Sequence, residues 1–309
     1  MRVFLAGATG AIGRPLLPRL VAAGHEVTGM TRSDARAEAI RATGAKAVVG
    51  DALDAEALRA AIVEARPEAI VHQLTALPHR FDPRDNGIYD ATNRVRTQGT
   101  RNLLAAAREA GAGRFVCQSI AFAYEPSGHM VKTEEEPLYR DAPAPFDTGV
   151  AAIADMERQV LDADGVVLRY GWFYGPGTYY ARGGSSYTDV QKRRFPIVRP
   201  GTGVFSFIHV DDAADATVAA VERGASGVYN IVDDEPAPMR DWLPLYARAV
   251  GAKPPRRVPR WLARLAAGGF VASMASELRG ASNEKAKREL GWTPAHASWR
   301  TGFAESLSS

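Results

Sequence analysis

The sequence predicts an α/β protein with a doubly wound parallel sheet and a smaller, mainly helical part toward the C-terminus. Two observations carry this prediction. Short apolar runs alternate with segments of helical periodicity through the first half of the chain, which is the pattern of consecutive βαβ units. After residue 172 this alternation gives way to a stretch rich in Gly, Pro and aromatic residues, and then to helical segments separated by prolines.

The predicted strands are short and apolar throughout, which suits a sheet that helices cover on both faces. They are residues 3–6, 27–30, 47–49, 69–72, 114–117, 166–168, 205–210 and 228–232. The predicted helices carry apolar residues three and four positions apart. They are residues 12–23, 34–43, 54–65, 93–110, 148–163, 212–222, 239–250, 261–275 and 283–290. These elements predict a nucleotide-binding domain of residues 1–172 plus about 205–231, and a substrate-binding part with a lid formed by about 173–204 plus 232–309.

Composition excludes several classes of protein. The 309 residues are 46% hydrophobic and 24% charged, and the net charge of +3 gives no reason to expect nucleic acid as a partner. No apolar run is long enough to span a bilayer, and the first one runs into glycines instead of a signal-peptide cleavage site. The single cysteine, Cys117, permits no internal disulfide, and the histidines lack metal-ligand spacing. We therefore expect a cytoplasmic protein without metal that binds small molecules, and its oligomeric state stays open.

Gly7, Gly10 and Gly13 form the strongest motif, because they follow the first predicted strand and open the first predicted helix. In a dinucleotide-binding turn, the first glycine permits the tight turn and the second lets the backbone approach the pyrophosphate. The third allows the helix to pack closely on the strand. The N-terminus of the helix then offers free N–H groups to the phosphates. This order of elements predicts a Rossmann-like dinucleotide site.

The end of the second predicted strand favours NADP(H) over NAD(H). A carboxylate at this place binds the ribose 2′-hydroxyl of NAD, whereas an arginine accommodates the 2′-phosphate of NADP. The sequence has Arg32 and Ser33 here, with no acidic residue before Asp34. Asp51, directly after the third strand, is expected either to face the adenine amino group or to cap a helix.

Further motifs follow the glycine turn in order along the chain. They are Val-His-Gln-Leu-Thr at 71–75, Gly-Thr-Arg-Asn-Leu-Leu at 99–104, Arg-Phe-Val-Cys-Gln-Ser at 114–119, Leu-Arg-Tyr-Gly at 168–171, Tyr-Gly-Pro-Gly at 174–177 and Phe-Ile-His-Val-Asp-Asp at 207–212. With them the chain resembles the extended short-chain dehydrogenases/reductases, a family that includes NAD-dependent sugar epimerases and dehydratases. The resemblance implies that the cofactor also contacts Thr9, Ala11, Ile12, Ala52, Leu74, Thr75, Asn93, Tyr170 and Phe173.

The chain departs from this family at the residues that carry its proton chemistry. The family's Tyr-x-x-x-Lys pair aligns with Thr148 and Ala152. A threonine hydroxyl without a neighbouring lysine cannot shuttle a proton near neutral pH. The family's helix asparagine aligns with Arg96, and Asn93 lies one turn earlier. The active site is therefore expected to be atypical, with Thr148 at the position of the missing tyrosine.

A hydrogen-bond donor for a developing oxyanion is expected after the fifth strand. Ser119 is the nearest match to the family's catalytic serine, although an alignment through Tyr124 places Ile120 there instead. Gln118 is the alternative donor. We predict Ser119 as the oxyanion donor, because one such contact is what carbonyl reduction requires of the protein.

Among atypical members of the family, the sequence most resembles actinobacterial reductases of secondary metabolism. The resemblance implies NADPH-dependent reduction of a ketone on a flat aromatic polyketide of the angucyclinone type. A neighbouring phenol would polarise such a ketone, so the enzyme would need no acid of its own. Tyr179, Tyr180 and Tyr187 are expected to form an aromatic lid. Two alternatives stay open: a non-catalytic NADP-binding sensor or scaffold, and a nucleotide-sugar epimerase or dehydratase.

Overall fold

The computed structural model describes residues 1–82 and 84–308; residues 83 and 309, which the predicted domains include, lie outside the described residues. Its centre is a seven-stranded sheet in the order β12-β7-β5-β4-β1-β2-β3, with every pair parallel. Its strands are β1 (Arg2–Ala6), β2 (Glu26–Thr31), β3 (Lys46–Val49), β4 (Ala69–His72), β5 (Arg114–Ile120), β7 (Val166–Tyr170) and β12 (Gly227–Ile231). The predicted α/β fold with a doubly wound parallel sheet is confirmed.

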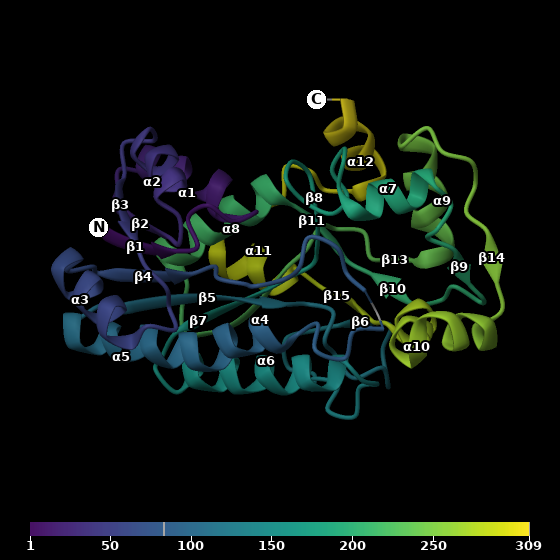
Figure 1. Ribbon diagram of the computed structural model, residues 1–309, viewed down its shortest axis with the longest axis horizontal. Coiled ribbons are helices and arrows are strands. Elements are labelled where there is room, and N and C mark those ends of the chain that lie inside the picture. The colour runs from purple at the N-terminus through teal and green to yellow at the C-terminus, as the bar shows by residue number, and fades with distance from the viewer. Residues whose placement is uncertain (83, 309) are drawn as a thin grey trace.

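Helices cover both faces of the sheet, which explains why its strands are apolar almost throughout. Figure 1 shows the two layers, and apolar clusters join each layer to the sheet. One layer is α3 (Ala55–Ala65), α4 (Asp90–Arg94), the π-helix η1 (Val95–Gly99), α5 (Thr100–Ala110) and α6 (Phe146–Leu161). The other is α1 (Gly13–Ala22), α2 (Asp34–Arg41), α8 (Val210–Arg223) and α11 (Glu284–Leu290).

Strand β1 lies between β2 and β4, so the chain winds to opposite sides of it. In open α/β sheets, ligands bind outside the carboxyl ends of the strands at this switch point. The carboxyl end of β1 is also where the Gly7–Gly13 turn begins. The topology therefore places the expected dinucleotide site at the centre of one edge of the sheet.

The remaining elements gather beyond the carboxyl ends of the strands (Figure 1). Their helices are α7 (Ser185–Gln191), α9 (Met239–Ala249), α10 (Arg260–Glu277) and α12 (Trp299–Ser308). Their short strands are β6 (Val131–Lys132), β8 (Trp172–Tyr174), β9 (Ile197–Val198), β10 (Val204–Phe205), β11 (Phe207–His209), β13 (Ala237–Pro238), β14 (Arg257–Val258) and β15 (Gly280–Ala281). An aromatic core that includes Phe207, Trp242, Tyr246 and Phe303 holds these elements together.

Several elements differ from those expected. The predicted strand 205–210 is split into β10 and β11, because β10 pairs with β13 and β11 pairs with β8. The predicted helix 93–110 begins at Asp90 and contains the π-helical turn η1. Gly268, at φ +85°, interrupts α10. Helices α7 and α12 were not predicted.

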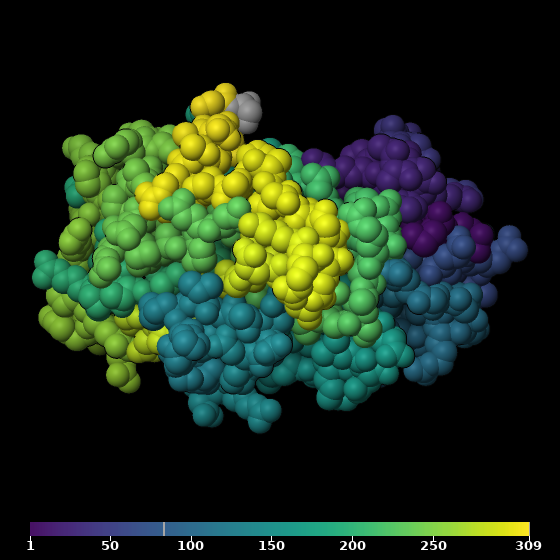
Figure 2. All heavy atoms as spheres, turned by 180° about the vertical axis from the view of Figure 1, so that it is seen from behind, coloured from purple at the N-terminus to yellow at the C-terminus, as the bar shows by residue number. Residues whose placement is uncertain are grey.

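The C-terminal residues, yellow in Figure 2, spread across the back of the molecule toward α8. The buried carboxylate of Asp212 on α8 accepts hydrogen bonds from the backbone N–H groups of Ala295 and His296, both at 2.9 Å. The indole N–H of Trp292 donates to the carbonyl of Asp212 at 3.1 Å. These contacts attach the C-terminal segment to the nucleotide-binding part. Within the described residues, no helix is long and apolar enough to cross a membrane.

Candidate functional site

The turn between β1 and α1 contains three glycines, and the absence of their side chains shapes the space for a ligand. Gly7 has φ +96°, and a Cβ on it would lie 2.9 Å from the carbonyl of Gln73. A Cβ on Gly13 would overlap the carbonyl oxygen of Gly7. A Cβ on Gly10 would meet only that same oxygen, at 3.3 Å, and otherwise points into open space. Gly7 and Gly13 therefore shape the turn, and Gly10 leaves its outer side free, as a bound pyrophosphate requires.

The other residues of the glycine turn contact β2 and the core. The hydroxyl of Thr9 lies 3.2 Å from that of Thr31, the last residue of β2. Ala11 is half-buried, and Ile12 packs into the core beneath the start of α1. The N-terminus of α1 is thus held at the switch point of the sheet, and the residues present fit a dinucleotide.

Arg32 is the free cation that the sequence predicts at the end of β2. Its side chain is exposed, and within the described residues it makes no hydrogen bond or ion pair. Ser33 precedes α2 as its N-cap, although its hydroxyl makes no capping bond. The guanidinium of Arg32 therefore has no partner among the described residues, and its contact with the 2′-phosphate of NADP stays a prediction.

Asp51 and Ala52 lie in the turn after β3. A carboxylate oxygen of Asp51 accepts a hydrogen bond from the backbone N–H of Leu53 at 2.9 Å. Ala52 is buried, and its carbonyl accepts a hydrogen bond from the amide of Asn102 at 2.8 Å. Asp51 therefore stabilises its own turn, while a contact of Asp51 or Ala52 with adenine stays a prediction.

Tyr170, which we expect to contact the cofactor, turns its side chain into the core, and the contact stays a prediction. Its side chain is completely buried, and its hydroxyl lies between the amide of Gln73 at 2.9 Å and the hydroxyl of Thr217 at 2.6 Å. The cause is strand alternation, which turns the last residue of β7 toward α8. Leu74 and Thr75 follow β4, and Phe173 lies beside the ring of Tyr170; all three remain at least partly exposed at this edge.

The structure places Ser119, our predicted oxyanion donor, inside the protein, and its catalytic role stays a prediction. Ser119 is buried, and its hydroxyl donates to Glu157 on α6 at 2.6 Å. Residues of β5 point alternately to the two faces of the sheet, and Ser119 belongs to the face that α6 covers. Gln118 points to the opposite face, where it is buried and its amide donates to the carbonyl of Leu74 at 3.3 Å. Both side chains that we predicted as donors are therefore occupied within the protein.

Ser119 is one end of a buried polar network. Arg169 donates to both carboxylate oxygens of Glu157, at 2.9 and 2.5 Å, and also to the hydroxyl of Tyr124 at 2.9 Å. Tyr124 donates in turn to the side-chain oxygen of Asn230 at 2.7 Å. Burial raises the pKa of Tyr124 to about 12. The network ties β5, α6, β7 and β12 together, and its hydrogen bonds are made within the protein.

The start of α6 faces the same edge of the sheet. Thr148 is exposed; its hydroxyl donates to the carbonyl of Pro145 at 3.0 Å and accepts from the amide of Asn93 at 3.4 Å. Ala152, one turn further, is buried. No tyrosine anywhere in the sequence is followed four residues later by a lysine. The structure thus brings Asn93 and Thr148 together without an acid–base pair between them.

Two residues near this edge were not among our predicted site residues: Tyr89 and Arg96. Arg96 is 3% exposed, and its Nε has no hydrogen-bond partner; burial lowers its pKa to about 10. The ring of Tyr89 packs between Phe81 and Phe146, with centroid distances of 5.8 and 6.0 Å. The signal in the sequence was the replacement of the family asparagine by Arg96, together with a spacing of seven residues that returns Tyr89 to the same helix face.

Aromatic side chains wall the space beside the start of α6. A small cavity of about 20 Å³ is lined by Phe122, Tyr139, Phe146 and Phe270 among others. Phe122 stacks on Trp172, with ring centroids 4.0 Å apart. The lining is therefore mainly aromatic and apolar, and the cavity itself holds no more than about one water molecule.

The prediction of a lid made of three tyrosines is only partly correct. Tyr180 and Tyr187 are buried in the aromatic core of the C-terminal part, and they are not available to cover a ligand. Tyr179 reaches across to the loop after β4, where its hydroxyl donates to the carbonyl of Pro78 at 2.5 Å. The segment just before Tyr179 lies close to the start of α1, because a Cβ on Gly177 would overlap the guanidinium of Arg14.

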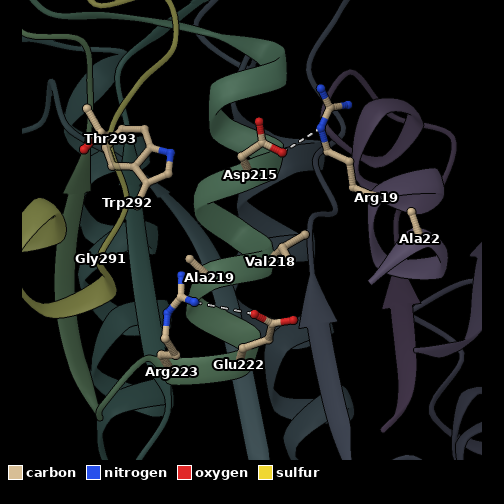
Figure 3. Close-up of a pocket in the computed structure, with 10 residues that line it drawn as sticks. All are labelled: Arg19, Ala22, Asp215, Val218, Ala219, Glu222, Arg223, Gly291, Trp292 and Thr293. Carbon is tan, nitrogen blue, oxygen red and sulfur yellow. Dashed lines mark hydrogen bonds and ion pairs between the residues drawn. The ribbon is translucent and has the colours of Figure 1, made fainter. Parts of the chain in front are cut away.

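A larger groove, of about 400 Å³, lies elsewhere, between α1, α8 and the loop around Trp292 (Figure 3). The charged side chains that line it are already paired, Arg19 with Asp215 and Arg223 with Glu222. The groove reaches Ala22 at the C-terminal end of α1, whereas the glycine turn is at the other end of that helix. It therefore does not belong to the candidate site.

Comparisons with known proteins agree with this geometry. Residues 3–232 match the NAD dependent epimerase/dehydratase family. The chain is 51% identical to the 3-diazoavenalumate denitrifying reductase of a Streptomyces species, over 98% of this chain and 99% of that protein. It is 29% identical to a 4-hydroxy-2-methyl-3-oxo-4-farnesyl-3,4-dihydroquinoline-1-oxide ketoreductase of Stigmatella aurantiaca, over 82% and 74% of the two chains.

A similar fold occurs in the UDP-glucose 4-epimerase of Thermus thermophilus in complex with NAD. The TM-score is 0.76 at 22% identity, and the match covers 100% of this chain and 98% of the other. At this level of identity the similarity shows the fold alone. Together with the family match, the glycine turn and the topology of the sheet, it leads to one conclusion. The chain belongs to the NAD-dependent epimerase/dehydratase family and is an NAD(P)-dependent oxidoreductase.

Proposed function

We propose that the protein is an NADPH-dependent reductase that replaces a diazo group on an aromatic carbon by hydrogen and releases N₂. The observation that carries this proposal is the start of α6, where Thr148 and Ala152 provide no acid–base pair. A reaction that consumes no proton at the reacting carbon is compatible with such a site. The relative that is 51% identical is named for the reductive removal of nitrogen from a diazo compound, which supports the same chemistry.

The balance of the reaction explains why no acid is needed. When bound, the nicotinamide cofactor supplies a hydride. A C–H bond forms at the carbon that carried the diazo group, and the electron pair of the broken C–N bond leaves with N₂. Neither bond change uses a proton, whereas reduction of a ketone leaves an alkoxide that must be protonated.

In this proposal, the side chains of the chain position the reactants and exclude water. The backbone around Gly10 and the start of α1 bind the pyrophosphate, and Arg32 pairs with the 2′-phosphate, which is why we propose a preference for NADPH. Phe122 and Phe146 hold the aromatic ring. Water would compete with hydride for a diazo-bearing carbon, so an aromatic lining protects the reaction. The substrate-binding part is proposed to be residues 173–204 and 232–309.

Reduction of a ketone is the second candidate, and the ketoreductase relative at 29% identity favours it. The angucyclinone substrate, and the simocyclinone ketoreductase as a specific counterpart, belong to this candidate. An epimerase or dehydratase is less well supported, because its chemistry needs an efficient proton-transfer pair. A non-catalytic NADP sensor predicts cofactor binding without turnover.

The test uses NADPH labelled with deuterium on one or the other face of C4, together with an aromatic diazo carboxylate and, separately, a panel of aromatic ketones. We expect release of N₂ and deuterium on the ring carbon from one labelled face only, with none from D₂O. Transfer from both faces is the mark of reaction without the enzyme, and Gly10→Val, which should not bind NADPH, measures that background. Turnover of ketones but not of the diazo compound selects the second candidate, and cofactor binding without any turnover selects the sensor.

A further inference from the structure

One face of the continuous helix formed by α4 and η1 carries polar groups that the fold leaves unsatisfied. Tyr89, Asn93 and Arg96 follow each other at spacings of four and three residues, which places them on one side of a helix. This side faces α6, since η1 and α4 both pack against that helix. Side chains on a helix lean toward its N-terminus, which here lies at the carboxyl edge of the sheet, so these groups point toward the reaction site.

Arg96 is a buried cation without a partner of its own. Its Nε makes no hydrogen bond, and within the described residues neither terminal nitrogen of the guanidinium makes one. The charged or titratable groups around it are Tyr89, Cys117 on β5, His72 on β4 and Glu157 on α6. Glu157 is the acid among them, and Arg169 already occupies both of its oxygens.

The other neighbours of Arg96 do not balance its charge. His72 is completely buried, and burial together with the charge of Arg96 lowers its pKa to about 3, so it is neutral. Burial raises the pKa of both Cys117 and Tyr89, so these groups are neutral as well. The cluster of Arg96, Arg169 and Glu157 therefore carries a surplus positive charge. An uncompensated buried charge is costly, and an anionic ligand group beside it would offset that cost.

Two more polar groups on this face lack partners. The side-chain oxygen of Asn93 is buried without a hydrogen bond, while its nitrogen donates to Thr148. The hydroxyl of Tyr89 makes no hydrogen bond within the described part of the chain, and its ring lies against Gly149, next to Thr148. A donor from Tyr89 and the guanidinium of Arg96 are thus available close to the start of α6.

We propose that Arg96 and Tyr89 bind the ionised ring oxygen of the substrate, which makes the enzyme selective for aromatic compounds with an oxide beside the reacting carbon. This inference rests on the proposed function and names its substrate class. An aromatic diazo compound with a ring oxide is neutral overall, because the positive diazo group balances the negative oxide. The negative charge is shared between the oxygen and the ring carbon that carries the diazo group. A cation at the oxygen draws negative charge toward it and leaves the carbon more positive, which favours attack by hydride. The oxide persists through the reaction, and the product takes a proton from solvent after release.

The first test measures an oxyanion site without any turnover. The probe is 4-hydroxy-3-nitrobenzoate, whose phenolate is yellow, bound to the protein saturated with NADP⁺. We expect the pKa of the bound phenol to fall by at least about one unit, which is a tenfold change in its ionisation constant. Arg96→Met should abolish the shift, Arg96→Lys should keep part of it, and Tyr89→Phe should reduce it. An equal shift in Arg96→Met, or no binding of the probe, overturns the proposal.

Matched controls separate this effect from damage to the fold. Arg94→Met removes an exposed arginine from the same helix, and Tyr229→Phe removes a tyrosine hydroxyl on β12 that donates to the carbonyl of Ala225. Both should leave the shift unchanged. Each variant must also keep its affinity for NADP⁺ and its circular dichroism, and Arg96→Lys remains informative if Arg96→Met does not fold.

The second test compares diazo substrates that carry a ring hydroxyl or a methoxy group beside the reacting carbon. We expect Arg96→Met to slow the hydroxyl substrate by about 100-fold, the effect of one lost charge-stabilising contact, and to leave the methoxy substrate unchanged. Equal slowing of both substrates means that Arg96 is only structural, and overturns the inference. If no diazo compound reacts but the probe still shows its shift, the proposed function fails and the oxyanion site stands.

Discussion

Two regions near the carboxyl edge of the sheet differ in construction: one is a glycine turn and the other is a buried network of polar side chains. At the turn between β1 and α1, the space for a ligand exists because Gly7, Gly10 and Gly13 have no side chains. Between β5, α6 and β7, the structure is built instead from buried polar side chains that pair with one another, including Glu157 and Arg169. The first region depends on backbone geometry and tolerates almost no added atom. The second depends on hydrogen-bond partners, so its function changes when one partner changes.

Gly10→Val gives the largest expected effect on the glycine turn. The added side chain fills the open space above the turn and blocks the contacts of backbone N–H groups with the pyrophosphate. The loss of two such charge-assisted bonds weakens binding of both NADPH and NADH by about 1,000-fold. Titration of cofactor fluorescence measures this, and Gly113→Val, at a glycine with nothing within 4 Å of an added Cβ, is the matched control. Unchanged affinity in a folded Gly10→Val protein shows that the turn is only structural.

Arg32→Asp tests a side chain of the cofactor site, next to the glycine turn. It replaces a charge-assisted contact with the 2′-phosphate by repulsion, and should weaken binding of NADPH by about 100-fold. Affinity for NADH should stay the same or rise, so the preference between the two cofactors reverses. Isothermal titration of both cofactors checks this. The idea fails if the unmodified protein binds NADH and NADPH equally well.

Ser119→Ala gives the smallest effect on turnover and tests the second region. Ser119 supports Glu157 inside the buried network, so its loss should lower the free energy of unfolding by about 1–3 kcal/mol. It should slow turnover by far less than the roughly 100-fold or more that removal of an oxyanion donor costs. Urea unfolding and kcat are the two measurements. A large loss of kcat at unchanged stability would support the catalytic role that the sequence predicts for Ser119.

The difference between the regions also explains what the sequence could predict. Alternating apolar runs and helical periodicity predicted all seven strands of the sheet, because burial on both faces leaves a clear pattern. The glycine turn was predictable since each glycine stands at a place where a side chain would collide or block. Arg32 was predictable as a cofactor residue because it stands directly after β2.

The polar residues of the second region could not be assigned in this way. Whether Ser119 or Ile120 faces the site depends on a shift of one residue along β5, and strand alternation makes that shift decisive. The same alternation decides that the side chain of Tyr170, at the end of β7, is buried. Arg96 lies in a π-helical turn, which adds a residue to the helix without a signal in the apolar pattern.

The contact between Gly177 and Arg14 has a consequence for the kinetics of the enzyme. The segment after β8 approaches the side chain of Arg14 in the first turn of α1, next to the place where we propose that the phosphates bind, and Gly177 has φ +78° at this contact. We expect a bound dinucleotide to lie between this segment and the glycine turn, so that the segment must move before the cofactor departs. We therefore expect a long residence time for the oxidised cofactor. The first turnover should then appear as a rapid burst, with later cycles paced by cofactor exchange.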